Sequence, residues 1–320
     1  MTSFDVFNGD ADGIIALHQL RLAEPRPDAE LVTGVKRDIN LLAKLRDVRQ
    51  ARVTVLDISL DSNREALNTL LAAGCTIFYA DHHFAGEIPA TAALTAHIDP
   101  NPEVCTSLII DRLLAGRYRA WAIAAAFGDN LHDAARLAAA PLDLTELQLA
   151  TLRELGELLN YNGYGRTVAD LHLPPDELYL ALHGCDDPFA FCAQAPILAK
   201  LRQGFADDMA RARACAPLQD GPAGRIFSFP AAPWARRVAG VFSNEKARER
   251  KDIAHALLVD NSDNTFTVSV RAPLNNKNGA DSLCRRFPTG GGRSGAAGVN
   301  RLPADQLDSF IRAFAEVFTS

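Results

Sequence analysis

The chain has 320 residues, of which 48% are hydrophobic and 22% charged, a globular composition long enough for two domains with separate cores. Its start lacks the basic and apolar regions of a signal peptide, and no apolar run is long enough to span a bilayer. The 6 cysteines contain no C-x-x-C pair, which argues against a zinc cluster or a disulfide framework. We therefore expect a cytoplasmic protein with reduced thiols and no membrane partner.

The net charge of −6 is unevenly distributed along the chain. Between Arg225 and Arg301 there are 13 Lys and Arg residues against 6 Asp and Glu, whereas the remainder of the chain is acidic. This asymmetry suits an acidic metal site in the front part and an anion-binding site in the rear part. An uneven surface charge is common in itself, so this asymmetry alone does not establish either site.

Residues 1–130 alternate short β-branched or aromatic runs with helical patterns, which predicts an α/β domain built on a parallel sheet. The strand candidates are Phe4–Phe7, Leu31–Val35, Val53–Leu56, Thr76–Ala80 and a buried segment near Ala122–Phe127. The helix candidates are Ile14–Ala23, Ile39–Arg49, Ser62–Ala73 and Thr106–Leu114.

Acidic and imidazole side chains follow four of these apolar runs. They are Asn8, Asp10 and Asp12 after the first run, Asp57 after Val53–Leu56, Asp81, His82 and His83 after Thr76–Ala80, and Asp129 after Ala120–Phe127. The carboxyl ends of parallel strands share one edge of an α/β sheet, and ligands bind there. Oxygen and imidazole donors without cysteine match cations such as Mn²⁺ or Mg²⁺, and a central carboxylate such as Asp57 can bridge two ions.

Residues 131–215 show a mainly helical pattern, strongest in three segments, and extend the first domain as a connector. These segments are Ala134–Ala139, Leu144–Leu159 and Pro196–Ala214. An aromatic loop, residues 161–165, interrupts them, and the sequence leaves open whether it stacks on a base or forms a packed turn. We expect a first domain at residues 1–215, a Gly- and Pro-rich linker at 216–224 and a second domain at 225–320.

The second domain has the pattern of a smaller α+β unit. Its strand candidates are Arg225–Phe229, Ala256–Val259 and Phe266–Arg271, and its helix candidates are Gly279–Phe287 and Ala304–Phe318. A glycine run at Gly290, Gly291 and Gly292 lets backbone amides approach an anion, although such runs are equally typical of flexible turns. Arg293 directly after it, and Arg271 at a strand end, are candidate anion clamps.

Taken together, these motifs resemble the DHH phosphoesterase family, named for the triplet Asp81-His82-His83. The matching features, in the family's order, are the D-x-D turn at Asp10 and Asp12, the strand-end Asp57, the triplet, Asp129, the segment Val268–Arg271 and the glycine-rich run Gly290–Gly298 of a DHH-associated domain. The resemblance covers nearly the whole chain. It implies Mn²⁺-dependent hydrolysis of phosphoric anhydrides and diesters.

The resemblance also implies a role for each site residue. One Mn²⁺ would be held by Asp10 and Asp57 and a second by Asp12, Asp57, His82 and Asp129, with Mg²⁺ or Co²⁺ as alternatives. Asp81 would support these ligands, and His83 would face the substrate phosphate or the leaving group. Substrate would lie between the two domains, bound by Arg271, Gly290, Gly291, Gly292 and Arg293.

Two positions depart from the family pattern, because Asn8 and Arg293 stand where family members usually carry histidine. An amide oxygen at Asn8 would bind a borderline metal less well than imidazole does. Arg293 is charged at any working pH, so it would grip a phosphate and would not donate a proton.

Three functions are compatible with these residues. The first is a two-metal phosphohydrolase acting on a small nucleotide or a short single-stranded oligonucleotide. The second is a hydrolase of inorganic pyrophosphate or polyphosphate, and the third is a non-catalytic nucleotide sensor with a decayed site. A homodimer is compatible with all three.

Overall fold

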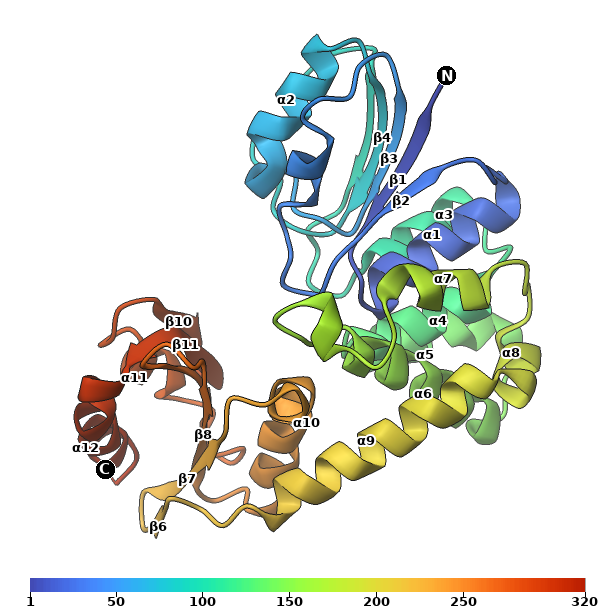
Figure 1. Cartoon of the computed structure of the whole chain (residues 1–320). Helices are drawn as coiled ribbons and strands as arrows, with labels where there is room; N and C mark the ends of the chain where they lie inside the picture. The colour runs from blue at the N-terminus through green and yellow to red at the C-terminus, as the bar shows by residue number, and fades with distance from the viewer. Residues whose placement is uncertain (320) are drawn as a thin grey trace. The chain divides into compact units, whose positions relative to one another are not determined.

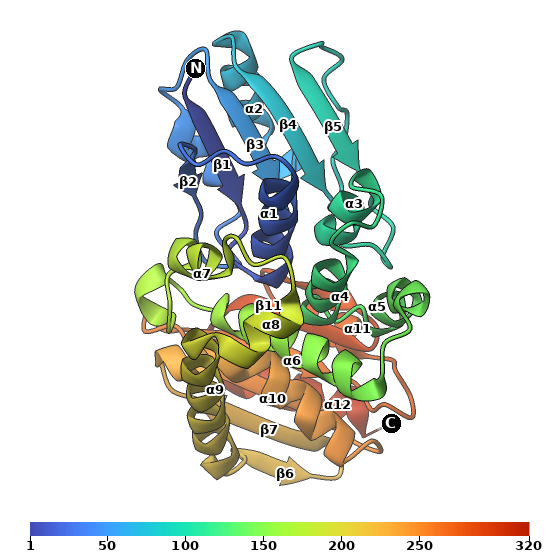
Figure 2. The same cartoon turned by 90° about the vertical axis from the view of Figure 1, so that its right-hand side faces the viewer.

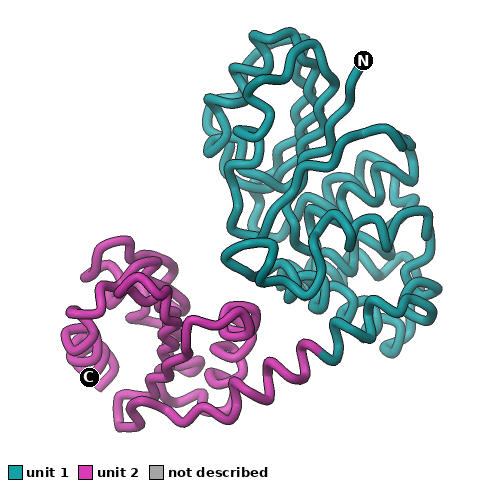
Figure 3. Tube along the Cα trace, in the orientation of Figure 1, with its two compact units in different colours: residues 1–203 teal, residues 204–320 magenta. Residues whose placement is uncertain are grey.

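The computed structural model describes residues 1–319 and divides into two compact units, residues 1–203 and 204–320 (Figure 3). The division falls inside α9 (Pro196–Ala214), so this helix belongs partly to each unit. The segment expected to be a linker, residues 216–224, contains a short strand of the second unit's sheet, β6 (Gln219–Gly221). None of the helices in the described part of the chain has the length and apolar character needed to cross a bilayer.

The first unit is built on a five-stranded parallel sheet with the strand order β2-β1-β3-β4-β5. Its strands are β1 (Ser3–Phe7), β2 (Glu30–Val32), β3 (Arg52–Leu56), β4 (Thr76–Asp81) and β5 (Leu94–Ile98). The predicted α/β class and parallel sheet are confirmed. The edge strand β5 was not predicted, because none of its residues is fully buried and its sequence lacks a continuous apolar run.

Helices cover both faces of this sheet (Figures 1 and 2). On one face lie α1 (Ala11–Ala23) and α3 (Thr106–Leu113), and on the other lie α2 (Arg64–Ala72) and the short 3₁₀ helix η1 (Leu41–Leu45). Phe4 and Val6 of β1 enter the apolar core beside η1 and α2. Asp5, which points to the opposite face, forms a buried ion pair with Arg21 of α1. The helix predicted at Ile39–Arg49 is shorter in the structure, where only η1 (Leu41–Leu45) forms within this range.

One predicted strand is a helix in the structure. The apolar run at Ala122–Phe127 lies within α4 (Arg119–Gly128), which is buried from Trp121 onwards. An uninterrupted apolar run has no periodicity that separates a buried strand from a buried helix, and its alanines favour the helix. Asp129 consequently follows a helix as its C-cap residue and does not follow a strand.

The rest of the first unit is helical, as predicted for the connector. Its helices are α5 (His132–Ala139), α6 (Glu146–Asn162), α7 (Pro175–Leu182) and α8 (Pro188–Gln194). The predicted aromatic loop begins later than expected, because Tyr161 and Asn162 form the last residues of α6. Tyr161 is buried and its hydroxyl lies 2.7 Å from Nε2 of His172. Tyr161 is therefore part of the packed interior and presents no face to a base.

The second unit has a six-stranded sheet with the order β10-β11-β9-β8-β7-β6, in which only β7 and β8 are parallel. Besides β6, its strands are β7 (Gly224–Phe229), β8 (Ala254–Asp260), β9 (Thr265–Arg271), β10 (Gly290–Arg293) and β11 (Ala296–Pro303). The crossover between β7 and β8 is α10 (Pro233–Glu249), which the sequence reading missed. A core beside α11 (Ala280–Cys284) and α12 (Leu307–Phe318) includes Val268 and Val270. The predicted α+β unit is confirmed.

The glycine run is a strand and not a loop. Gly290–Arg293 form the edge strand β10, which pairs antiparallel with β11 through a tight turn. A Cβ at Gly290 would lie 1.8 Å from the carbonyl oxygen of Cys284, so close packing against α11 explains glycine there. The expected loop is thus corrected to one arm of a hairpin, and its contact with phosphate remains a prediction.

Candidate metal centre

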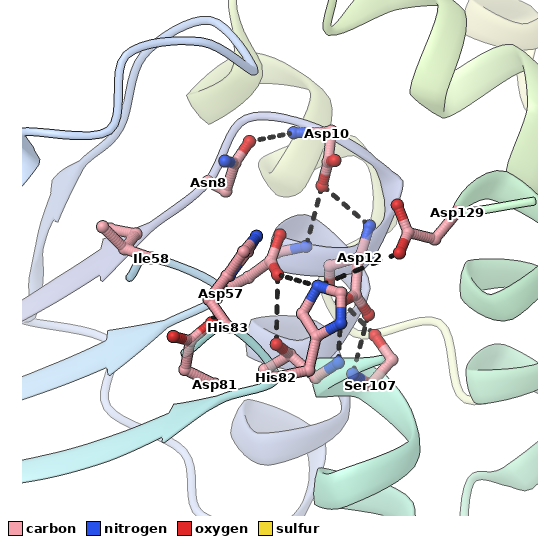
Figure 4. A network of polar contacts seen from close by, with 12 residues as sticks. Asn8, Asp10, Asp12, Asp57, Ile58, Asp81, His82, His83, Ser107 and Asp129 are labelled. Atoms are coloured by element: carbon pink, nitrogen blue, oxygen red, sulfur yellow. Dashed lines mark hydrogen bonds and ion pairs between the residues drawn. The ribbon is translucent and has the colours of Figure 1, made fainter. Parts of the chain in front are cut away.

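Strand register brings three of the predicted site residues to one edge of the first sheet. Phe7 pairs with Leu56, and Leu56 pairs with Ala80, across the three neighbouring strands β1, β3 and β4. The next residue along the chain is Asn8, Asp57 or Asp81, and Figure 4 shows the three at the same edge of the sheet. The prediction that strand ends deliver these side chains to a common edge is confirmed for these strands.

The turn between β1 and α1 is shaped by close approach of the backbone. A Cβ at Gly13 would lie 2.2 Å from the carbonyl oxygen of Asn8, and a Cβ at Gly9 would lie 1.9 Å from that of Gly34. Neither glycine has a positive φ, so both are required for space and not for an unusual backbone conformation. Asp10 caps α1, and its Oδ1 accepts the backbone amides of Asp12 and Gly13 at 3.0 and 3.1 Å.

Asp12 joins the first helix to the third. Its two carboxylate oxygens each accept a backbone amide from the first turn of α3, from Thr106 and Ser107, both at 2.7 Å. The Ser107 hydroxyl donates to the Asp12 carbonyl at 2.8 Å. The amino-terminal amides of α3 therefore stabilise a buried carboxylate, and each oxygen keeps a second lone pair that can bind a cation.

Asp57 occupies the centre of the edge in an unusual conformation. Its φ of 59° lies in the left-handed region, which costs energy for a residue other than glycine and is tolerated best by Asp and Asn. The Thr106 hydroxyl donates to Asp57 Oδ1 at 3.1 Å. Burial raises the pKa of Asp57 well above its usual range, and the negative charges of Asp12 and Asp10 raise it further. A cation at this position would relieve that repulsion.

His82 presents one nitrogen to the carboxylates. Its Nδ1 lies 2.9 Å from the carbonyl oxygen of Val104, which can only accept, so Nδ1 carries the proton. Nε2 is then a lone-pair donor, 3.5 Å from Asp57 Oδ1 and 3.8 Å from Asp129 Oδ2. An imidazole held in one tautomer by a backbone carbonyl is a typical metal ligand.

His83 is oriented by Asp81 in the same way. Its Nδ1 lies 2.7 Å from Asp81 Oδ1, while its side chain is 46% exposed. This hydrogen bond raises the pKa of His83 against the opposing effect of burial. Asp81 Oδ2 is buried and finds no hydrogen-bond partner among the described residues. Asp81 therefore orients His83, and its predicted role in supporting the metal ligands remains a prediction.

The arrangement of donors fits a divalent cation. Two sets of three residues could each hold an ion, because the ligand atoms within each set lie within 4.8 Å of one another. One set is Asp57, His82 and His83, and the other is Asp12, His82 and Asp129. Carboxylate and imidazole donors without thiolate suit Mn²⁺ or Mg²⁺. The predicted ligands Asp12, Asp57, His82 and Asp129 are thus brought together, and the metal-ligand role of each remains a prediction.

Lys36 lies in the same cluster, and the sequence reading missed it. Its ammonium nitrogen is 2.5 Å from Asp10 Oδ2, 3.3 Å from Asp129 Oδ1 and 2.9 Å from Asn160 Oδ1. Burial opposes the charge, but Asp10 and other anionic groups raise the pKa of Lys36 well above its usual range. In turn Lys36 outweighs the effect of burial on Asp10 and lowers its pKa. A signal was available, because Lys36 directly follows the strand candidate Leu31–Val35.

Asn8 contacts protein groups at both ends of its amide. Its Nδ2 donates to the carbonyl of Lys36 at 3.1 Å, and its Oδ1 accepts the backbone amide of Asp10 at 3.2 Å. Asn8 thereby fastens the segment that carries Lys36 to the turn that carries Asp10. Its predicted role as a metal ligand remains untested.

The predicted substrate-binding residues all lie in the second unit. Arg271 pairs with Ala296, and Ala296 pairs with Arg293, so both arginines occupy one rung of the sheet and leave the same face. Arg271 Nε donates to Asn244 Oδ1 at 2.8 Å, whereas Arg293 is exposed. Gly290, Gly291 and Gly292 continue along the edge strand from Arg293.

Fold and site together define a class of protein. It is a two-unit α/β protein whose parallel sheet gathers carboxylate and imidazole donors for a divalent cation at its carboxyl edge. No family model and no curated protein matches the chain. Solved structures do match it, over nearly its whole length.

Three of these structures identify the fold. A crystal structure of the exonuclease RecJ bound to manganese is 15% identical, with 98% of this chain and 89% of that chain covered and a TM-score of 0.61. The pGpG-specific phosphodiesterase PggH from Vibrio cholerae is 12% identical over 99% of both chains, with a TM-score of 0.55. An exopolyphosphatase-related protein from Bacteroides fragilis is 14% identical over 99% of this chain and 91% of that chain, with a TM-score of 0.50. The chain therefore has the RecJ-like DHH fold, as the resemblance implied.

Proposed function

We propose that the chain is a metal-dependent phosphohydrolase acting on a small nucleotide phosphate or a short single-stranded oligonucleotide. The observation that carries the proposal is the cluster of Asp12, Asp57, His82 and Asp129 at the carboxyl edge of a RecJ-like sheet. The matching structures include an exonuclease and a phosphodiesterase, which supports the reaction class.

The chain's own residues prepare the site for a divalent ion such as Mn²⁺, Mg²⁺ or Co²⁺. A divalent ion at such a site lowers the pKa of a water molecule and offsets charge on phosphoryl oxygens. Asp12 and Asp57 are fixed by donors on α3, and His82 is fixed by a backbone carbonyl, so three ligands are oriented before the ion binds. Such preorganisation is the main protein contribution to this chemistry.

His83 supplies the most accessible proton-bearing group of the cluster. Asp81 holds its Nδ1, which leaves Nε2 to donate to a phosphoryl oxygen or to a leaving group. The raised pKa of His83 favours the protonated form that such a role requires. In this proposal Asp81 and His83 act as a pair, with Asp81 positioning and His83 touching the substrate.

The number of ions is the finer part of the proposal. The family resemblance implies two ions, one beside Asp10 and one beside Asp12, which typically lie about 3.5–4 Å apart. Both grouped sets of donors in the structure lie on the His82 side of the cluster. The two sets share His82, and neither of them includes Asp10.

A second candidate is hydrolysis of inorganic pyrophosphate or polyphosphate. Burial of Tyr161 favours it, because only Tyr164 of the two loop tyrosines is left as a candidate for stacking on a base. The fold match to an exopolyphosphatase-related protein also supports it.

A substrate panel separates the candidates. Purified protein with Mn²⁺ is incubated with pyrophosphate, polyphosphate, an adenosine bisphosphate, cyclic dinucleotides and two- to five-residue oligonucleotides, and phosphate and nucleotide release are followed. We expect release from a nucleotide substrate that EDTA abolishes. Release from pyrophosphate or polyphosphate alone would select the second candidate. No release with Mn²⁺, Mg²⁺ or Co²⁺, together with ligand-dependent melting, would show a nucleotide sensor.

A further inference from the structure

The ammonium group of Lys36 is fully coordinated inside the carboxylate cluster. Its three N–H bonds have three acceptors, which are Asp10 Oδ2 at 2.5 Å, Asn160 Oδ1 at 2.9 Å and Asp129 Oδ1 at 3.3 Å. These acceptors come from α1, α6 and the end of α4, so three separate elements converge on one cation. The side chain of Lys36 is only 22% exposed.

The backbone of Lys36 is also fixed. Its amide donates to the carbonyl of Gly163 at 2.8 Å, and its carbonyl accepts from Asn8 Nδ2 at 3.1 Å. The ammonium lies 5.6 Å from the ring centre of Tyr164, within the range of a cation–π contact. Contacts to backbone, amide, carboxylates and ring together hold this lysine in the cluster, unlike a surface lysine that reaches an acid by chance.

Both carboxylate oxygens of Asp10 already have partners within the protein. Its Oδ1 accepts two backbone amides as the cap of α1, and its Oδ2 contacts Lys36. Among residues 1–319, none of the donor sets that could hold a metal ion includes Asp10. The carboxylate that the two-ion arrangement requires for its first ion therefore already has a cation beside it.

We propose that the Lys36 ammonium takes the place of the cation beside Asp10, so that the site holds one divalent ion, bound on the side of Asp12, Asp57 and His82. The proposal deepens the proposed function and rests on it only in assuming that the cluster binds a divalent ion. It accounts for Asn8 as well. With the Lys36 ammonium beside Asp10, no imidazole ligand is needed at position 8. The Asn8 side-chain amide instead donates a hydrogen bond to the Lys36 carbonyl.

The chemical consequence is a fixed single positive charge where a family member would have an exchangeable ion. Lys36 balances Asp10 and Asp129 without a metal, so this part of the site is assembled in the apo protein. Metal dependence should then reflect one binding event per chain, with no cooperativity between two ions.

Metal counting tests the proposal without reference to activity. Wild-type protein freed of metal is titrated with Mn²⁺ by calorimetry, and the bound ion is examined by electron paramagnetic resonance. We expect one Mn²⁺ per chain with the hyperfine pattern of an isolated ion. The variant Lys36→Met removes the charge at similar length, and we expect it to bind two ions with an exchange-coupled spectrum. Lys36→Arg keeps a cation and should bind one.

Lys44→Met is the matched control, because Lys44 is an exposed lysine of η1 that pairs with Asp38 outside the carboxylate cluster. It should leave the stoichiometry at one. Two coupled ions in the wild type would overturn the proposal, since Lys36 would then have left Asp10 on metal binding, while the proposed function would stand. No bound Mn²⁺ in the wild type would overturn both. If Lys36→Met does not fold, the wild-type spectrum and the Lys36→Arg stoichiometry still decide.

Discussion

The carboxyl edge of the first sheet and the arginine rung of the second differ in how their charges are satisfied. At the first, Asp10, Asp12 and Asp57 are buried, and each accepts hydrogen bonds from neighbouring protein groups. At the second, Arg293 stands exposed on an edge strand. The first region is preorganised by packing, as a metal centre requires, whereas the second keeps a cation accessible to an anion from solvent. The two regions should therefore respond differently to the same kind of substitution.

The largest difference is expected from adding one methyl group to each region. In Gly13→Ala, the better helix propensity of alanine offers about 1 kcal/mol, but the new Cβ would lie 2.2 Å from the Asn8 carbonyl oxygen. The clash should dominate and lower the free energy of unfolding by about 3 kcal/mol. Gly291→Ala is the matched change, since no atom lies within 4 Å of a Cβ there.

Chemical denaturation of both variants measures this contrast. Gly291→Ala should stay within about 0.5 kcal/mol of the wild type or gain slightly. Equal losses in the two variants would show that the carboxyl edge of the first sheet is no more tightly packed than the hairpin edge of the second.

Acid should lower the stability of the first unit through His18, a buried residue of α1. Burial, with a further contribution from His183, lowers the pKa of His18 to about 4, although a hydrogen bond to the Cys185 carbonyl opposes this. The folded pKa is below the unfolded one, so the unfolded state binds the proton first as the pH falls from about 6.5 toward 4. The contribution of His18 to the free energy of unfolding should fall by about 2 kcal/mol between pH 7 and pH 5.

Denaturation of His18→Gln at both pH values checks this expectation. The variant should lose most of that pH dependence, and His97→Gln on β5 should keep it. A wild-type pH dependence that survives in His18→Gln would assign the effect to another group.

The smallest effect is expected at the exposed arginine. In Arg293→Ala, loss of one charge-assisted contact to a phosphate should raise KM about tenfold, near 1.4 kcal/mol, with kcat unchanged. Steady-state kinetics with the substrate found in the panel measures it, and Arg312→Ala on α12 is the control. A fall in kcat with KM constant would move Arg293 from substrate binding into the chemical step.

The sequence predicted the metal centre where a local rule applied. Asn8 and Asp57 directly follow strands and Asp81 ends one, and the rule that parallel strands end at one edge placed them correctly. Lys36 follows the strand candidate Leu31–Val35, but β2 ends at Val32, so the strand-end rule alone does not place this lysine in the cluster. Asp129 reached the cluster although its preceding segment is a helix, so its position was right and its element was wrong.

The remaining features depend on tertiary packing. Thr106 and Ser107 meet Asp12 because α3 begins at the sheet edge, and no pattern within α3 itself indicates this. Asn160 reaches Lys36 from α6. The glycine run was misread because Gly290 is required by the nearby Cys284 carbonyl, a contact that sequence spacing does not reveal.

If the carboxyl edge of the first sheet is the metal-dependent catalytic centre, the single substitution Asp57→Asn should remove most of the activity. The measurement is Mn²⁺-dependent phosphate or nucleotide release by this variant beside Asp47→Asn, whose side chain is 91% exposed in the wild type. We expect Asp57→Asn to lose more than about 100-fold, beyond the loss typical of outer ligand partners, while Asp47→Asn and both melting curves stay near the wild type. Wild-type turnover by a folded Asp57→Asn protein would contradict the account.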